Sequence, residues 1–280
     1  MVSSSAASDV YKRQPADYDK DVIEFAEQDY DLIVTVGTPM AEATARMAAV
    51  YPQTSFVLVD ATYASPLPNV QTILFDVHEP AFLAGYLSAA WTDLKDPGDP
   101  QVGWVGGMQG DAEERSALAY QAGVAYYNDG ADRDVRVLGE YVEADGGVMG
   151  GRRLANSLID EGVDVIFAVG GEAADGALVA AKERGKWGIG AEFDQYHRLP
   201  DQADILLTST VKRLDNALVA LLEETLTGES AGQTYAGTLS NSGVGLAPFH
   251  DFEDEIPDDI KRTLLEIQER ITKGDIDPLR

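Results

Sequence analysis

Short apolar runs alternate along the chain with segments whose apolar residues recur at helical spacing. The clearest example lies in the middle of the chain. A β-branched apolar run at 163–169 predicts a buried strand, which ends at Gly170 and Gly171. A helix predicted over 174–184 and a second strand predicted over 187–191 follow it. The pattern therefore predicts a complete β-α-β unit.

The same alternation predicts elements along the rest of the sequence. Further strands are predicted at 32–36, 56–60, 70–75, 102–105, 135–141, 205–209 and 235–239. Further helices are predicted at 19–28, 40–50, 80–91, 112–128, 150–161 and 214–227. Alternating strands and helices indicate parallel sheets of α/β type with right-handed crossovers. Because no long linker interrupts the pattern, we expect two intimately joined halves.

In open parallel sheets, ligands collect beyond the carboxyl ends of the strands. That rule places Gly170, Gly171, Glu192 and Asp194 on one rim, where we look for function. The two glycines would either let a ligand approach the backbone or only turn the chain. The unit contains neither G-x-G-x-x-G nor GK[ST], so dinucleotide and P-loop sites are excluded.

Composition narrows the function classes. With 280 residues, 45% of them hydrophobic, the chain can bury a large core, most simply in two domains or lobes. A net charge of −27 would repel phosphate backbones and anionic membranes, so we expect no nucleic-acid partner. Such acidity is typical of proteins from salty surroundings and also of ordinary acidic extracellular proteins.

Cysteine and histidine usage limits the possible metal chemistry. The chain has no cysteine, which excludes disulfides, thiolate metal sites and cysteine nucleophiles. Its three histidines, His78, His197 and His250, stand far apart in the sequence without HxxxH spacing. We therefore expect no histidine metal cluster and no cofactor. The sequence also lacks an apolar run long enough for a membrane-spanning helix.

The C-terminal motif GVGLAPFHDFEDEIPDDIK resembles the signature of one family, the basic-membrane-protein group of ABC-transporter solute-binding lipoproteins, relatives of purine-nucleoside receptors. FLAGYLSAAW, VGWVGGM, GVDVIFAVGG, AAKERG, IGAEFDQ and TSTVKRLDNA are similar to its other landmarks in the same order. The resemblance runs from about Pro15 to the end. It implies an α/β, type 1 periplasmic-binding-protein fold, with two doubly wound parallel-sheet lobes and a hinge cleft.

The function that the resemblance implies is a non-catalytic, extracytoplasmic receptor. It would bind a purine nucleoside or similar small molecule in the interlobe cleft and deliver it to ABC permease and ATPase subunits. The family's members are periplasmic or anchored to the cell membrane as lipoproteins. Contact with the membrane would come only through a lipid anchor, which this sequence lacks.

Lobe boundaries follow from the same resemblance. Residues 1–14 lack periodicity and are expected to be a non-native or flexible tail. Nothing matches the family's first β-α-β segment, so we expect an N-terminally truncated lobe 1, with the strand at 32–36 left at a sheet edge. Crossings near Trp104, Thr208 and Ser240 would divide the chain into two lobes. These are lobe 1 at 15–103 and 210–239, and lobe 2 at 104–209 and 240–280.

The resemblance also implies ligand contacts. Lys212 is expected to open a helix after the strand end TST and to hydrogen-bond a ribose. The alternative is that Lys212 is only a solvated helix residue, a role that its neighbour Arg213 could serve equally. IGAEFDQ is similar to the family's G-V-D-x-D-Q motif, with Glu192 where aspartate is usual. Glu192 and Asp194 would accept hydrogen bonds from ribose hydroxyls, or would be ordinary loop carboxylates with Asp194 capping a turn.

Contacts to the base are expected nearer the ends of other strands. Asp76, His78 and Glu79 precede the helix at Pro80, where a carboxylate would either cap the helix or accept from base nitrogens. The family's stacking aromatic aligns near Asp145. We therefore expect Tyr141 or Phe193 to replace it.

Two other function classes fit an α/β scaffold. A nucleoside-processing enzyme such as a hydrolase is disfavoured because clustered N-terminal aspartates and a Ser-His-acid arrangement are absent from the sequence. A ligand-sensing domain of a transcription regulator is disfavoured because no helix-turn-helix precedes Pro15 and the charge opposes DNA binding.

Overall fold

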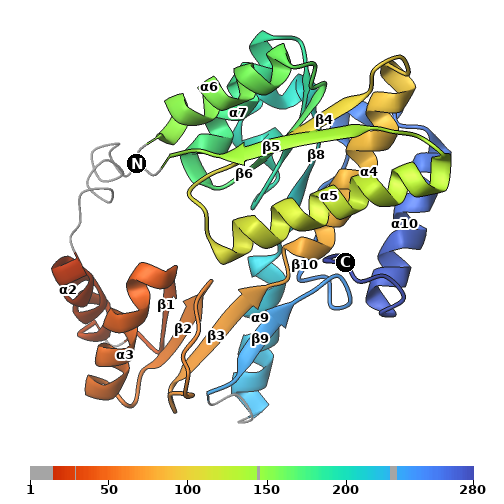
Figure 1. Cartoon of the computed structure of the whole chain (residues 1–280). Coiled ribbons are helices and arrows are strands. Elements are labelled where there is room, and N and C mark those ends of the chain that lie inside the picture. The colour runs from red at the N-terminus through yellow and green to blue at the C-terminus, as the bar shows by residue number, and fades with distance from the viewer. Residues whose placement is uncertain (1–14, 29, 144–145, 228–231) are drawn as a thin grey trace. The chain divides into compact units, whose positions relative to one another are not determined.

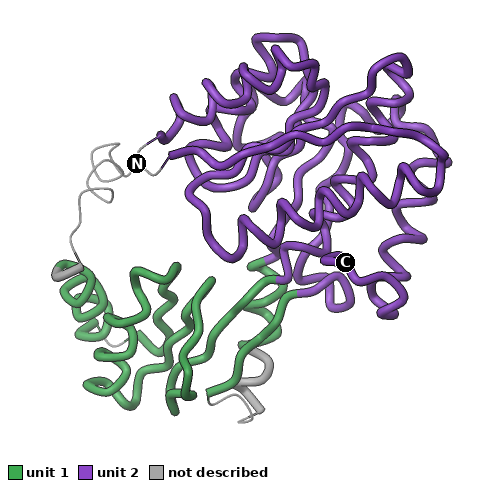
Figure 2. Tube along the Cα trace, viewed as in Figure 1, with its two compact units in different colours: residues 1–75, 214–237 green, residues 76–213, 238–280 purple. Residues whose placement is uncertain are grey.

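The computed structural model describes residues 15–28, 30–143, 146–227 and 232–280. These residues form two compact units (Figure 2). Unit 1 contains the described residues up to Phe75 and Leu214–Gly237, and unit 2 contains Asp76–Arg213 and Thr238–Arg280. The chain therefore passes from one unit to the other three times.

Unit 1 is built on a four-stranded parallel sheet with the order β1-β2-β3-β9 (Figure 1). Its strands are β1 (Leu32–Val36), β2 (Ser55–Val59), β3 (Val70–Phe75) and β9 (Thr234–Gly237). Its helices are α2 (Pro15–Ala26), the 3-10 turn η1 (Thr38–Met40), α3 (Ala41–Val50) and α9 (Leu214–Thr227). Phe56 and Leu58 pack with α2 and α3, whereas Val57 and Val59 pack with α9. Because both faces of β2 are covered, its residues from Phe56 to Val59 are all apolar and buried.

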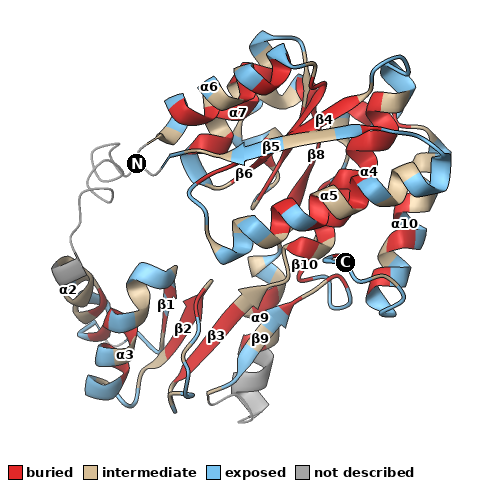
Figure 3. Ribbon diagram, in the orientation of Figure 1, coloured by how far each residue is buried: buried red, intermediate tan, exposed pale blue. Residues whose placement is uncertain are grey.

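Unit 2 is built on a six-stranded sheet with the order β10-β8-β7-β6-β4-β5. Its strands are β4 (Gln101–Gly106), β5 (Arg136–Tyr141), β6 (Val165–Val169), β7 (Trp187–Gly190), β8 (Leu206–Lys212) and β10 (Val244–Leu246). Only β10 is antiparallel to its neighbour among the strand pairs of this sheet described here. The central strands of this six-stranded sheet are buried and are coloured red in Figure 3.

Helices cover both faces of this sheet. They are α4 (His78–Lys95), α5 (Asp111–Ala131), α6 (Gly147–Asp160), α7 (Gly171–Glu183), α8 (Gln195–Arg198) and α10 (Asp258–Thr272), with 3-10 turns η2 (Pro200–Ile205) and η3 (His250–Phe252). The α4–α5 pair packs very closely: a Cβ atom at Gly123 of α5 would overlap the carbonyl oxygen of Phe82 in α4. Glycine is therefore required at this helix crossing.

The observed division of the chain differs from the expected one. The first crossing follows Phe75 and does not lie near Trp104, which sits in β4 inside the sheet of unit 2. The physical reason is Trp91 of α4, which is fully buried and packs edge-to-face on Trp187 and Phe252 of the same unit. The later crossings fall at 213/214 and 237/238, close to those expected near Thr208 and Ser240.

Among the strands of the described residues, β1 lies at the end of the strand order of its sheet, as expected. Ile33 and Thr35 are buried, but Val34 and Val36 are 41% and 57% exposed on the opposite face. Unit 1 thus presents an exposed apolar strip along an edge strand. Within the described residues, no helix combines the length and the apolar character that a bilayer crossing needs.

Candidate functional site

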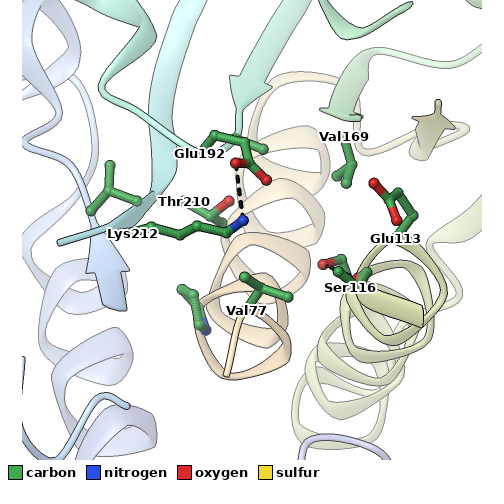
Figure 4. Close-up of a pocket in the computed structure, with 11 residues that line it drawn as sticks. Val77, Glu113, Ser116, Val169, Glu192, Thr210 and Lys212 are labelled. Carbon is green, nitrogen blue, oxygen red and sulfur yellow. Dashed lines mark hydrogen bonds and ion pairs between the residues drawn. The ribbon is translucent and has the colours of Figure 1, made fainter. Parts of the chain in front are cut away.

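A pocket opens in unit 2 where the carboxyl ends of its parallel strands meet the first turns of α4 and α5 (Figure 4). Its lining residues come from five segments: the start of α4, the start of α5 and the ends of β6, β7 and β8. The labelled ones are Val77, Glu113, Ser116, Val169, Glu192, Thr210 and Lys212. The site therefore lies at the rim that the strand-end rule indicated.

An ion pair between Lys212 and Glu192 forms one side of this pocket, with 3.0 Å between the Lys212 Nζ and a Glu192 carboxylate oxygen. The Lys212 side chain is only 13% exposed, whereas that of Glu192 is 40% exposed. The backbone holds the two together, because the Lys212 N–H donates to the Glu192 carbonyl at 3.0 Å. Glu192 adopts a left-handed conformation (φ 74°), which turns the chain after β7.

Lys212 does not open a helix, as the sequence led us to expect. It is the last residue of β8, and α9 begins at Leu214. The strand continues to Lys212 because β10 pairs with it, with Val244 opposite Lys212. The extended backbone carries the lysine to the rim.

The free room in the pocket is small, ≈ 20 Å³, about that of one water molecule. Val77 and Val169 supply apolar surface. Glu113 and Ser116, both on α5, lie on the opposite side of the pocket from Lys212 (Figure 4). An organic solute can therefore reach the two charges only by separating the ion pair or by lying at its exposed side. Together the pair offers one acceptor group and one donor group to a hydroxylated molecule.

Gly170 and Gly171 have different local roles. Gly170 has φ 99°, and a Cβ there would come within 2.7 Å of the Gly107 nitrogen. It therefore lets the loops after β4 and β6 pack together. Gly171 has φ 58° and begins α7, and a Cβ there would meet nothing within 4 Å. Contact of either glycine with a ligand stays a prediction.

Asp194 serves as a cap, which was the alternative left open by the sequence. Its Oδ1 accepts a hydrogen bond from the Tyr196 N–H at 3.2 Å, at the start of α8. Its Oδ2 lies 2.8 Å from the His250 Nε2. Of the three residues 192–194, Glu192 lines the pocket, while Phe193 is 58% exposed.

The capping role expected for Asp76, His78 or Glu79 is wrong for α4, because Val77 is its N-cap residue and makes no side-chain cap hydrogen bond. The Glu79 carboxylate instead accepts from the Leu239 N–H at 2.6 Å. Burial raises the pKa of Glu79, and the hydrogen bond from Leu239 opposes that rise. Glu79 therefore ties the start of α4 to the turn after Thr238.

His78 and Asp76 lie beside Arg115 of α5. The Arg115 guanidinium donates to the His78 Nδ1 at 3.0 Å and lies 3.6 Å from the Asp76 carboxylate. Burial, followed by the charge of Arg115, lowers the pKa of His78. A neutral imidazole that accepts from arginine fits this arrangement.

Tyr141 ends β5, and its ring packs edge-to-face on Trp104 with 4.9 Å between the centroids. Burial, together with the charges of Glu114 and Glu113, raises the pKa of Tyr141. Tyr141 thus packs on Trp104 and is not among the residues that line the Lys212 pocket, although Glu113, which lines that pocket, is near enough to act on it electrostatically. Asp145 lies outside the described residues.

The sequence analysis missed Glu113 and Ser116. Both belong to the first turns of α5, directly after the GGMQGD loop that follows β4. The rule that helices following parallel strands begin at the ligand rim would have placed them there. Which residues of the first turns of α5 face the pocket depends on the rotation of the helix about its axis. The sequence of the preceding loop does not determine that rotation.

Comparison with known proteins identifies the family. A family profile described as "ABC transporter substrate-binding protein PnrA-like" matches residues 2–275. The chain belongs to this family, Bmp. The matched range includes most of the N-terminal segment that we set apart, which lies outside the described residues.

Individual relatives agree with the Bmp assignment. Basic membrane protein B of Borrelia garinii subsp. bavariensis is 31% identical over 260 residues, 90% of this chain and 72% of that protein. The CD4+ T-cell-stimulating antigen of Listeria innocua serovar 6a is 30% identical over 275 residues, 93% and 73% of the two chains. A solute-binding protein of an ABC transporter system from Aeropyrum pernix K1 shares the fold, with a TM-score of 0.79 at 24% identity over 95% of this chain and 81% of that one.

As a Bmp protein, the chain is an extracytoplasmic solute-binding component of an ABC transporter and not an enzyme. The expected α/β fold of the type 1 periplasmic-binding-protein class is confirmed, with one parallel sheet in unit 1 and one mostly parallel sheet in unit 2.

Proposed function

We propose that this Bmp protein binds a nucleoside-like solute, with Lys212 and Glu192 holding the sugar hydroxyls, and delivers it to an ABC permease with its ATPase subunits. The observation that carries the proposal is the ion pair at the strand-end rim between the largely shielded Lys212 and the more exposed Glu192. Vicinal hydroxyls can donate to the carboxylate and accept from the ammonium group. Each charged hydrogen bond of this kind contributes about 1.5–3 kcal/mol.

Charge favours a neutral solute over a phosphorylated one. The chain carries a net charge of −27, and both Glu113 and Glu192 line the pocket. These carboxylates would repel the negative charge of a nucleotide phosphate at short range, whereas a nucleoside carries no negative charge for them to repel. We therefore expect purine nucleosides, or similar hydroxylated molecules, to bind in preference to their monophosphates.

We propose fewer residues for contact with the base than the sequence indicated. Phe193 is the better candidate for stacking, because it is 58% exposed next to Glu192 while Tyr141 already packs on Trp104. Stacking on an aromatic ring contributes about 1–3 kcal/mol per base. Asp76 is the acidic candidate for ring nitrogens, because Glu79 accepts a 2.6 Å hydrogen bond from the Leu239 N–H, whereas Arg115 lies 3.6 Å from the Asp76 carboxylate, beyond hydrogen-bond distance. Membrane attachment through a lipid anchor stays a prediction from the family resemblance.

The test is calorimetry of the 280-residue protein with guanosine, adenosine, inosine and guanosine monophosphate. Lys212→Ala should weaken nucleoside binding by about 1.5–3 kcal/mol, the scale of a charged hydrogen bond. The matched control is Arg213→Ala, which removes an exposed cation one residue away and should change binding little. Equal effects of the two substitutions, or tighter binding of the monophosphate, would contradict the proposal.

A further inference from the structure

Two histidines that are distant in the sequence meet at one carboxylate in unit 2. His197 belongs to α8 and His250 begins η3. The His250 Nε2 lies 2.8 Å from the Asp194 Oδ2, and the His197 Nε2 lies 3.7 Å from the same oxygen. One ligand atom from each residue lies within 4.8 Å of the others. Sequence spacing did not predict this cluster, because the fold of the chain between α8 and η3 creates it.

The two distances to Asp194 lie close to the separation between ligands of a bound transition metal. Zinc bonds of about 2.0–2.2 Å in a tetrahedral arrangement place neighbouring ligand atoms about 3.3–3.6 Å apart. The observed 2.8 Å and 3.7 Å lie on either side of that value. The His197 side chain is 72% exposed, so a small rotation can bring its imidazole to the metal position.

The other two ligands are already oriented by their neighbours. The Asp194 Oδ1 is engaged by the Tyr196 N–H, which leaves Oδ2 for the cluster. The His250 ring stacks on Tyr196 with 4.0 Å between centroids and 12° between planes. The Tyr196 hydroxyl donates to Asp251 at 3.0 Å, which holds the stacked ring in turn. Such supporting contacts are typical of metal sites, where they fix the ligand geometry.

A purely structural role explains only part of this arrangement. The helix cap and the Asp194–His250 contact account for two of the three residues without any ion. The His197 imidazole is 72% exposed and contacts the Tyr196 and His250 rings edge-on, and neither contact requires its Nε2 to lie 3.7 Å from the same oxygen. We propose that Asp194, His197 and His250 form a site for a borderline-soft divalent cation such as Zn²⁺, with a fourth position left to water.

The chemistry of the donors separates this class of ion from others. Two imidazoles and one carboxylate suit Zn²⁺, Ni²⁺ or Cu²⁺, whereas Ca²⁺ and Mg²⁺ prefer oxygen donors alone. A bound ion would join the α8 turn to η3 and so brace the segment directly after Glu192. This inference does not depend on the identity of the solute.

The experiment is calorimetric titration of the tag-free, chelator-treated 280-residue protein with ZnCl₂. We expect one Zn²⁺ per chain, and at least a tenfold loss of affinity in His197→Gln, since removing even a supporting contact costs about 10–100-fold. His197 is exposed, so this variant should keep the wild-type melting temperature in the absence of metal. The matched control is His78→Gln, which removes the remaining histidine and should bind Zn²⁺ as the wild type does.

A second measurement uses Co²⁺ as the probe. The wild type and His78→Gln should show the visible absorption bands of a low-coordinate nitrogen and oxygen site, and His197→Gln should lose them. The inference is overturned if the wild type does not bind Zn²⁺, or if His197→Gln binds it as tightly as the wild type. It is equally overturned if many weak sites replace a single one, because the ions would then be held by exposed carboxylates in general.

Discussion

Replacing Trp91 by leucine tests the assignment of α4 to unit 2. Trp91 is 0% exposed, and its ring contacts Trp187 and Phe252 edge-to-face, each with 5.6 Å between centroids. The three tryptophans of the chain, Trp91, Trp104 and Trp187, all lie in unit 2. Tryptophan fluorescence therefore reports the unfolding of that unit, and two reporters remain after the substitution.

The magnitude follows from three contributions. Loss of two edge-to-face contacts costs about 1–3 kcal/mol. The incompletely filled space costs about 1–2 kcal/mol more. The indole N–H is buried without a hydrogen-bond partner among the described residues, so removing it returns about 1 kcal/mol. These contributions add up to a net loss of about 1–4 kcal/mol in the free energy of unfolding of unit 2.

The assay is urea denaturation followed by tryptophan fluorescence. Leu94→Ala provides a control on the same helix, because Leu94 is 51% exposed and its truncation should cost less than about 0.5 kcal/mol. If Trp91→Leu left the midpoint of the fluorescence transition unchanged, α4 would not belong to the core of unit 2. The observed division after Phe75 would then be wrong.

Three further predictions address other features of the units. Gly123→Ala should lower the melting temperature, because its Cβ would overlap the Phe82 carbonyl, whereas Gly130→Ala on the same helix meets nothing within 4 Å and should be neutral or stabilise by up to about 1 kcal/mol. Burial raises the pKa of Glu79 in the folded state, so its ionisation penalises folding increasingly as the pH rises from the ordinary glutamate pKa to the raised one. Glu79→Gln should therefore raise the melting temperature at pH 7, and the gain should vanish as the pH falls below the ordinary glutamate pKa. Val36→Lys should reduce self-association measured by light scattering, because it places a charge on the exposed edge strand, whereas Val50→Lys on α3 should not. A higher melting temperature of Glu79→Gln at every pH would contradict the second prediction. Equal self-association of Val36→Lys and Val50→Lys would contradict the third.

Local patterns were sufficient for most of the elements. The strands at 32–36 and 70–75 have the predicted limits, because turn residues bound both apolar runs. Helix α10 was not predicted, although it is amphipathic, with buried Leu264, Ile267 and Ile271. The chain crossing after Phe75 could not be read locally, because it depends on which sheet α4 packs against.

In the candidate site, too, some features could be predicted from local sequence and others depend on tertiary contacts. Glu192 and Lys212 could be placed at the rim because each lies at or just after the end of a strand, and the structure pairs them at 3.0 Å. The continuation of β8 to Lys212 depends on β10, whose residues lie far along the chain. The meeting of His197 and His250 at Asp194 is likewise a product of tertiary folding. Sequence spacing therefore predicts positions along an edge but not partners brought from a distance.

The most direct test of solute binding at the rim is a native mass spectrum of the protein isolated from cells without added ligand. We predict a retained species with the mass of a neutral, hydroxylated molecule of nucleoside size, present in the wild type and Arg213→Ala and lost in Lys212→Ala. A retained phosphorylated molecule, or equal retention by Lys212→Ala and the wild type, would contradict the account.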